Sequence, residues 1–237
     1  MLYKALPITL LIGTLAFSFD LTYKKYDEFL AKYVCNNGVV YSKLSKDNIT
    51  DVLAQELSSL SKAEYDKLNE ANKIAYLINV YNFYTILLIK QNYPVTSIRK
   101  TKKPWDTQFV PLFGKKVSLN YIEHEVLRKQ FDEPRIHFAL VCASIGCPSI
   151  SDKAFIGSKL DQQLDEVAKT FLNDKAKNRV EGNKLFLSKI FEWYGDDFKK
   201  KHGGFKNYVI SVLGLKGKYT IKFTNYDWNL NEVSDCK

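Results

Sequence analysis

The chain has 237 residues, of which 46% are apolar and 26% charged, a balance typical of a globular protein and not of a disordered one. Four cysteines are too few for a disulfide scaffold of this size, and no apolar run reaches the roughly 18 residues of a membrane span. The net charge of +9 favours anionic partners such as an envelope surface, but the lysines are scattered and no zinc-finger or RNA-binding signature accompanies them, so no specific nucleic-acid binding is predicted.

Residues 1–18 are predicted to be a secretory signal peptide. Lys4 precedes a short apolar stretch from Ala5 to Phe17, and Ser18 is a small residue after which a signal peptidase can cleave. The alternative is a membrane anchor or a buried N-terminal helix, but charged residues follow the stretch at once. We therefore expect a periplasmic or secreted protein, with residues 19–237 forming a single domain.

The first half of that domain favours helices. They are predicted at 21–33, 48–60 and 61–91, the last beginning at a capping box of Ser61 and Glu64 and breaking near Asn72. A hairpin turning at Gly114 is predicted over 109–117, and a helix over 118–130.

The second half mixes helices with short strands. Residues 135–141 alternate and are rich in large apolar groups, which predicts a buried strand. Further elements are expected as a helix at 160–172, a hairpin at 179–187, helices at 188–200 and 204–213, and a strand at 219–223. Together the elements predict an α+β fold, mostly helical, with a small mixed or antiparallel sheet.

Glu123 and His124 lie side by side on the predicted helix over 118–130. At 100° per residue Glu123 falls within the apolar stripe and His124 at its margin. A carboxylate in an apolar stripe is costly unless it is paired. Glu123 is therefore expected either to form a buried ion pair, for example with Arg135, or to belong to a functional site.

Cys142 is placed where the predicted buried strand runs out into a loop, a common position for active-site residues. A nucleophilic cysteine needs a nearby base. Five residues of extended chain would put His137 about 16 Å from Cys142 and on the opposite face. His124 is thus the more plausible base, provided that its helix packs beside the strand.

Other roles for the cysteines stay open. Cys142 and Cys147 could form a short disulfide in an exported protein, and Cys35 and Cys236 could pair as well. A metal site from His124, His137, Cys142 and Cys147 is a further alternative. Their spacing matches no metal motif, so neither a metal nor a cofactor is expected.

Asn79 and Asn82 share one face of an otherwise apolar helix. Buried amides must be hydrogen-bonded, so both are expected to pin a loop, with direct contact to a substrate as the alternative.

Several motifs resemble the DUF547 family. They include Ala75–Asn82, Pro104-Trp105-Asp106, Leu119–His124 and Pro134–Pro148, and similar blocks extend to Asn231. The resemblance covers roughly residues 65–231. It implies a papain-like or transglutaminase-like cysteine hydrolase whose motif positions fall here on Glu123, His124 and Cys142. The family more often carries Asn where this chain has Val141.

These observations lead to two hypotheses. In the first, an exported cysteine hydrolase cleaves peptide or amide bonds of a peptide or protein substrate. Cys142 attacks, His124 transfers the proton, and Glu123 sets the polarity of the site, with His137 or Asp227 as candidate supporting groups. In the second, the protein is a non-catalytic envelope binding module with a Cys142–Cys147 disulfide. The oligomeric state is left open.

Overall fold

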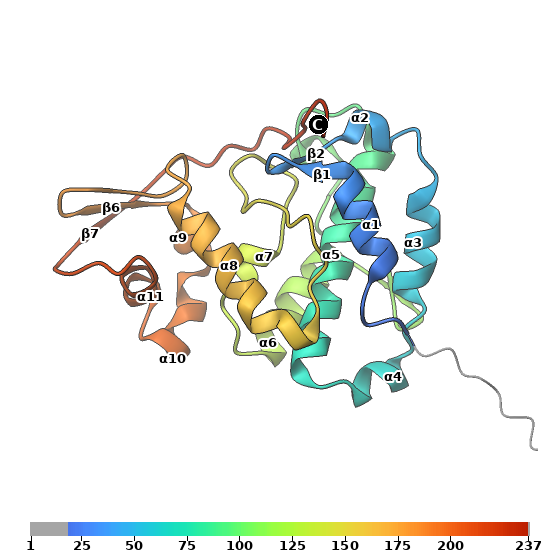
Figure 1. Cartoon of the computed structure of the whole chain (residues 1–237), viewed down its shortest axis with the longest axis horizontal. Coiled ribbons are helices and arrows are strands. Elements are labelled where there is room, and N and C mark those ends of the chain that lie inside the picture. Colours follow the sequence, from blue (N-terminus) through green and yellow to red (C-terminus); the bar gives the residue numbers. More distant parts are fainter. Residues whose placement is uncertain (1–18, 237) are drawn as a thin grey trace, which may run out of the picture.

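Helix α5 (Glu70–Asn92) is the central element of the computed structural model, which describes residues 19–236 (Figure 1). Every residue from Ile74 to Ile89 is buried. A helix that is apolar on all sides belongs in a core. The side chain of Asn69 accepts a hydrogen bond from the amide of Asn72 and caps the helix, so the break in the predicted 61–91 helix falls a few residues before Asn72. The proposed signal peptide lies outside the described residues.

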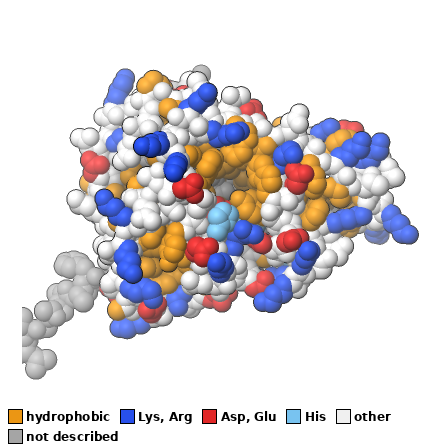
Figure 2. Space-filling model, turned by 180° about the vertical axis from the view of Figure 1, so that it is seen from behind, with side chains coloured by type: hydrophobic (Ala, Val, Ile, Leu, Met, Phe, Trp, Pro, Cys, Tyr) orange, Lys and Arg blue, Asp and Glu red, His pale blue; other side chains and the backbone are white. Residues whose placement is uncertain are grey.

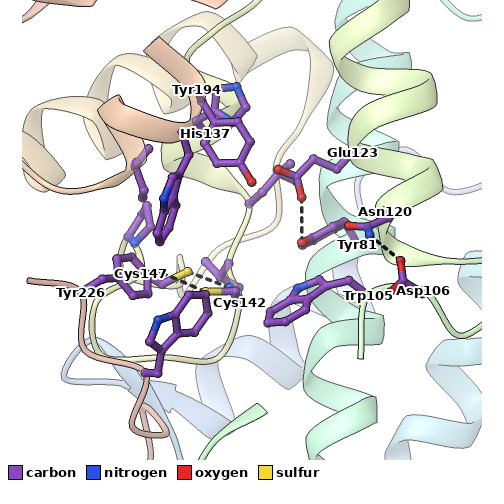
Figure 3. A pocket seen from close by; sticks show the side chains of 16 residues that line it. Tyr81, Trp105, Asp106, Asn120, Glu123, His137, Cys142, Cys147, Tyr194 and Tyr226 are labelled. Carbon is purple, nitrogen blue, oxygen red and sulfur yellow. Dashed lines mark hydrogen bonds between the residues drawn. The ribbon is translucent and has the colours of Figure 1, made fainter. Parts of the chain in front are cut away.

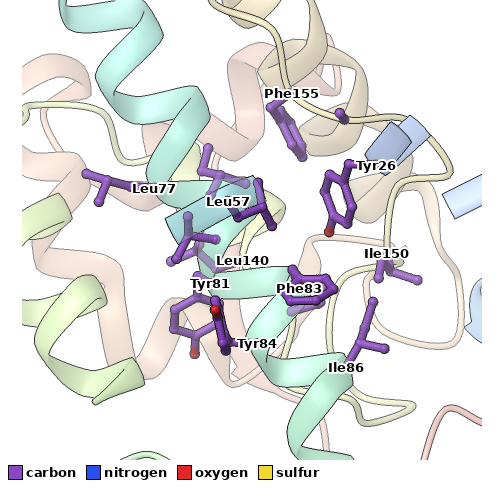
Figure 4. Packing of buried hydrophobic residues seen from close by; sticks show 14 of the residues in the cluster. Tyr26, Leu57, Leu77, Tyr81, Phe83, Tyr84, Ile86, Leu140, Ile150 and Phe155 are labelled. Carbon is purple, nitrogen blue, oxygen red and sulfur yellow. The ribbon is translucent and has the colours of Figure 1, made fainter. Parts of the chain in front are cut away.

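The N-terminal elements pack against α5. They are α1 (Lys24–Tyr33), the hairpin of β1 (Val34–Cys35) and β2 (Gly38–Val39), α2 (Tyr41–Leu44), α3 (Ile49–Ser58) and α4 (Lys62–Lys67). The capping box of Ser61 and Glu64 is confirmed at the start of α4. Figure 4 shows aromatic and aliphatic side chains of α5 meeting those of its neighbours in this larger cluster.

The middle of the chain carries the elements that position the site. They are η1 (Ile98–Lys100), β3 (Val110–Leu112), β4 (Lys115–Val117), η2 (Tyr121–Leu127), α6 (Arg128–Gln130) and α7 (Ile136–Ala139). The predicted hairpin is confirmed by the antiparallel pairing of β3 and β4. The helix over 118–130 is also confirmed, although η2 is a wide helix of π type.

The predicted strand over 135–141 is wrong, because its first residues form helix α7. Pro134 begins a turn in which its carbonyl accepts from the amide of His137, and the turn continues as the helix. The fixed backbone angle of proline suits the first turn of a helix. All four residues of α7 are buried, and a short segment buried on all sides has no helical periodicity to distinguish it from a strand.

The second half forms a smaller buried cluster and a mixed sheet. Its elements are η3 (Gly157–Lys159), α8 (Leu160–Asn173), β5 (Arg179–Glu181), β6 (Lys184–Leu187), α9 (Ile190–Tyr194), η4 (Gly195–Phe198), α10 (Lys199–His202), α11 (Phe205–Val212) and β7 (Thr220–Phe223). Strand β6 pairs antiparallel with β5 and parallel with β7. Phe138 and Phe198 belong to the second cluster, beside the larger one. The α+β class is confirmed, with the predicted helix at 188–200 divided into α9, η4 and α10.

Residues 224–236, here called the C-terminal strap, return across the molecule to the N-terminal hairpin (Figure 1). Leu230 pairs with Ser144, and Glu232 pairs with Val39. The predicted disulfide between Cys35 and Cys236 is confirmed. In residues 19–236 no helix combines the length and the apolar character needed to cross a membrane.

Candidate active site around Cys142

A cavity of about 330 Å³ lies between η2, the segment after α7, helix α9 and the C-terminal strap (Figure 3). Its wall includes Glu123, His137, Cys142, Cys147, Tyr194 and Tyr226. The two cysteines lie on one side of the cavity, and His137, Glu123 and Tyr194 lie on the other. Residues far apart in the chain thus meet around one hollow.

Asn82 holds the backbone that leads to Cys142. Its Nδ2 donates to the carbonyl of Ala139 at 2.9 Å, and its Oδ1 accepts from the amide of Val141 at 3.0 Å. Both halves of the buried amide are therefore satisfied. The prediction that Asn82 pins a loop is confirmed, and the loop is the one that carries Cys142.

The turn after Cys142 brings polar groups to its sulfur. Ala143 has a φ of 53°, a left-handed conformation that costs energy for a residue other than glycine and often marks a functional site. Ser144 then places its Oγ 3.1 Å from Sγ of Cys142. At Gly146 a Cβ would lie only 2.8 Å from the amide nitrogen of Asp227, so this approach of the strap requires glycine.

The environment of Cys142 favours its thiolate. Burial raises the pKa of the thiol, but hydrogen bonds from Cys147, Ser144 and Tyr226 outweigh burial, and the pKa falls below its ordinary value. The Tyr226 hydroxyl lies 3.0 Å from Sγ. In contrast, burial and the neighbouring Cys142 raise the pKa of Cys147 well above its ordinary value. Of the two cysteines, Cys142 is therefore the one whose thiolate is favoured.

The two cysteines are not bonded to each other. Both are free thiols, so the predicted alternative of a Cys142–Cys147 disulfide is corrected. The amide of Cys142 donates to Sγ of Cys147 at 2.8 Å, which keeps Cys147 beside the reactive sulfur as a hydrogen-bonding partner. Cys147 is also buried, whereas Cys142 is partly exposed at the cavity.

His137 reaches the cavity that the strand prediction kept it from. Because α7 is helical, the estimate of extended chain between His137 and Cys142 does not apply, and both side chains line the same cavity. Nε2 of His137 lies 2.7 Å from Oδ2 of Asp197, and its ring stacks on Tyr194 with centroids 4.1 Å apart. The carboxylate thus holds the imidazole in one orientation.

Asp197 was missed by sequence reasoning. It lies in a segment rich in charged residues that resembles a solvated surface, in which only Phe198 separates Asp196-Asp197 from three lysines. Burial raises the pKa of its carboxyl, but hydrogen bonds from Arg128 and His137, together with their charges, hold that pKa well below its usual range. No local pattern in the sequence indicates a partnership with His137, which lies 60 residues away.

The structure places His124 elsewhere. Among the described residues that line the cavity His124 is absent, and its Nδ1 lies 3.0 Å from Nη1 of Arg128. Asp227, predicted as a candidate supporting group, is exposed, and its Oδ1 accepts from the amide of Asn229. Asp227 instead supports the loop of Cys142 through its backbone, because its carbonyl accepts from the amide of Gly146 at 2.8 Å.

Glu123 lies in the cavity wall with only 6% of its surface exposed. Its Oε2 accepts from the hydroxyl of Tyr81 at 3.0 Å. The predicted ion pair with Arg135 is wrong, because Arg135 pairs with Glu133 and with two aspartates of α8, Asp161 and Asp165. A wide helical turn in η2 and the hydroxyl of a neighbouring helix place this carboxylate, and the apolar stripe correctly marked it as unusual.

Of the remaining predicted site residues, Asn79 has a structural role and Trp105 lines the cavity. Asn79 donates to the carbonyl of Phe155 at 2.8 Å and accepts from the amide of the same residue at 2.9 Å, so it pins a loop and is not part of the cavity wall. Trp105 lines the cavity and contacts Trp228 with ring centroids 5.9 Å apart. In residues 19–236 no group of three or more histidine, cysteine or acidic side chains is arranged to hold a metal ion.

Comparison with known proteins finds a family model that matches part of the chain. No curated protein and no solved structure matches it. Residues 65–172 match a family model described as "Protein of unknown function, DUF547". This segment contains α5, Glu123, His137 and Cys142, whereas Asp197 and the strap lie beyond it. The resemblance seen in the sequence is therefore confirmed over this segment, which is similar to the DUF547 family.

Proposed function

We propose that this protein is a cysteine-dependent hydrolase that cleaves peptide or amide bonds at the cavity around Cys142. One observation carries the proposal. A cysteine whose thiolate is favoured lines a cavity together with a histidine that a carboxylate orients. Nucleophile, acid–base group and orienting group are the three parts that such chemistry needs.

The proposed reaction proceeds through a thioester. The thiolate of Cys142 attacks the carbonyl carbon of the substrate, and the leaving amine takes a proton from the imidazolium of His137. A water molecule then gives a proton to His137 and attacks the thioester, which releases the acid and restores the thiolate. The hydroxyl of Tyr226, 3.0 Å from the sulfur, stabilises the thiolate before the attack.

The assignment of His137 as the proton carrier revises the role predicted for His124. Among the described residues neither histidine is hydrogen-bonded to Cys142, whose sulfur has only Ser144, Tyr226 and Cys147 as partners. A thiolate that hydroxyl donors stabilise needs no base in direct contact. His137 then acts from across the cavity, where a substrate lies between the two groups.

Export to the cell envelope is part of the proposal. The predicted signal peptide would target the chain for secretion, and the Cys35–Cys236 disulfide suits an oxidising compartment. Expression of the full chain in a bacterium is expected to yield a periplasmic protein that begins at Phe19, as measured by intact mass. An unprocessed protein in the cytosol would contradict export.

The partner surface is proposed to be anionic. We give the name basic arm to residues 175–184 and 214–223, which comprise β5, β7 and their flanking turns. Its exposed basic residues are Lys175, Arg179, Lys184, Lys216, Lys218 and Lys222, and its one acidic residue is Glu181. On the right of Figure 2, lysine and arginine side chains gather on a projecting part of the molecule. Such a concentration of positive charge attracts an anionic surface.

An acyl-enzyme assay tests the hydrolase. With p-nitrophenyl acetate as donor, we expect one acetyl group on Cys142, detected by intact mass and removed by hydroxylamine, and none in the Cys142→Ala variant. Asp197→Asn should slow deacylation, since it leaves the orientation of His137 unsupported, and the matched change Asp196→Asn should not. Acetylation that is unchanged in Cys142→Ala would contradict the proposal.

A further inference from the structure

The charges in the wall of the cavity have the opposite sign to the chain as a whole. The chain carries a net charge of +9. Among the described residues that line the cavity, the carboxylates of Asp106 and Glu123 are present and no lysine or arginine is. Asp106 lies at the exposed mouth, where Asn120 donates to it at 2.8 Å, and Glu123 is buried deeper.

The rest of the wall is rich in aromatic rings. All three tryptophans of the chain, Trp105, Trp193 and Trp228, line the cavity. Trp228 lies within 5.9 Å of the other two, centroid to centroid, and Tyr226 lies 4.6 Å from Trp228. Trp193 is 43% exposed, although large apolar side chains are usually covered. Aromatic faces attract cations, and tryptophan does so most strongly.

Two arginines outside the cavity wall already contact aromatic rings that line it. The guanidinium of Arg99 lies 5.2 Å from the centroid of the Trp228 ring, and that of Arg128 lies 5.1 Å from the centroid of Tyr194. Neither arginine lines the cavity. Two rings of the cavity wall thus already lie beside cations, and the same cavity is lined by the carboxylates of Asp106 and Glu123.

The buried carboxylate of Glu123 indicates the charge of a ligand that the cavity would bind. A buried carboxylate is costly unless a cation or several donors compensate it. Among the described residues the hydroxyls of Tyr81 and Tyr194 bond to Glu123, and Arg128 interacts with its charge from outside the cavity wall, but no lysine or arginine forms a salt bridge with it. A cationic ligand in the cavity would supply the direct ion pair that Glu123 lacks among the described residues.

We infer that the cavity binds an alkylammonium group, as carried by a lysine side chain, between the tryptophan rings and the carboxylates of Glu123 and Asp106. The inference rests on the proposed function in one respect, namely that this group belongs to the amide substrate of Cys142. A cavity of about 330 Å³ has room for a side chain of this size. The substrates are therefore amides with a basic side chain beside the cleaved bond.

Calorimetric titration of the Cys142→Ala protein with Nα-acetyl-lysine amide tests this inference. The uncharged analogue Nα-acetyl-norleucine amide has a similar chain without the ammonium. We expect the lysine compound to bind at least about tenfold more tightly, as a cation that pairs with a carboxylate and a ring would. Equal binding of the two compounds, or tighter binding of Nα-acetyl-glutamate amide, would overturn the inference.

Matched variants locate the site. Glu123→Gln should lower the affinity for the lysine compound about tenfold, whereas Glu125→Gln, an exposed neighbour paired with Lys129, should not change it. Since Glu123 is buried and its replacement could disturb the fold, the exposed Trp193 gives a second test. Trp193→Leu should weaken binding, and Tyr121→Leu, equally exposed but outside the cavity wall, should not. Equal effects of each pair would overturn the assignment.

These titrations do not depend on catalysis. If the lysine compound binds selectively but Cys142 is never acetylated, the hydrolase proposal fails and the ammonium site stands. If Cys142 is acetylated but the lysine and norleucine compounds bind alike, the ammonium site fails and the hydrolase proposal stands.

Discussion

Oδ2 of Asp197 lies 2.7 Å from Nε2 of His137, although the two residues come from different helical segments and are 60 positions apart. Arg128 reaches the same carboxylate at 2.6 Å, so the orientation of the imidazole depends on a cluster of three groups. Glu123 is not part of that cluster, because its oxygen accepts from Tyr81. Asp197 and Glu123 therefore have separate partners and, we propose, separate tasks.

Cys142 is expected to react as a thiolate below the pH at which an ordinary thiol ionises. Iodoacetamide should alkylate Cys142 at a pH well below about 8.5 and leave the buried Cys147 unmodified. Tyr226→Phe removes one donor and should slow the reaction at neutral pH about tenfold. Tyr219→Phe, whose hydroxyl bonds the carbonyl of Lys216, is the matched control. Peptide mapping by mass spectrometry measures both sites, and preferential labelling of Cys147 would contradict the assignment.

The contribution of Asp197 to stability should depend on pH in a defined direction. The pKa of its carboxyl is lower in the folded protein than in the unfolded chain, so the folded state gains stability above the unfolded value of about 3.9. Asp197→Asn should therefore lower the free energy of unfolding at pH 7 by about 1–3 kcal/mol. The difference from the wild type should shrink as the pH falls below about 4. Urea unfolding at pH 7, 5 and 3 tests this, and a constant difference would show that the carboxylate charge is irrelevant.

The two buried asparagines of α5 should separate stability from reactivity. Asn79→Leu and Asn82→Leu should each lower the free energy of unfolding by about 1–3 kcal/mol, because each leaves a buried carbonyl and a buried amide without a partner. Only Asn82 holds the amide before Cys142, so only its replacement should change the rate of alkylation of Cys142. Urea denaturation and the alkylation assay measure the two effects, and a slower thiol in Asn79→Leu would refute this division.

The basic arm should bind anionic vesicles in a salt-dependent way. The protein is expected to sediment with vesicles of mixed phosphatidylglycerol and phosphatidylcholine, and not with phosphatidylcholine alone. Binding should weaken as the salt concentration rises, since counterions screen exposed charges. The triple change of Lys216, Lys218 and Lys222 to Glu should abolish sedimentation. The same change at Lys24, Lys67 and Lys116, which are exposed and lie outside the arm, is the control. Equal losses in the two variants would assign the effect to net charge alone.

Local signals in the sequence predicted much of the fold. The capping box of Ser61, the turn at Gly114 and the period of α8 depend on neighbouring residues, and all three are confirmed. The segment around His137 was wrong because burial on every side removes the contrast between faces that distinguishes a helix from a strand. Because an extended chain would put His137 about 16 Å from Cys142, the wrong strand prediction excluded His137 as the base.

The site was predictable where its residues were chemically unusual. Cys142 and Glu123 were identified because a thiol before a loop and a carboxylate in an apolar stripe are both exceptional. Asp197 and Tyr226 were not identified, because their roles arise only when chain segments that are distant in sequence come together. In the sequence, a charged residue such as Asp197 or an aromatic residue such as Tyr226 cannot be distinguished from ordinary surface residues, because only tertiary contacts define its partner.

The C-terminal strap sets the order in which the cavity can be completed. Tyr226 and Trp228 follow every other lining residue in the chain, and the strap reaches the core through Ser144 and the amide of Leu230, which donates to Thr96. In a chain emerging from a ribosome, Cys142 thus appears 84 residues before Tyr226, one of the two residues whose hydroxyls contact its sulfur. Ser144 and Cys147 lie close to Cys142 in the chain, so the set of groups that favour its thiolate is complete only after the last segment has docked.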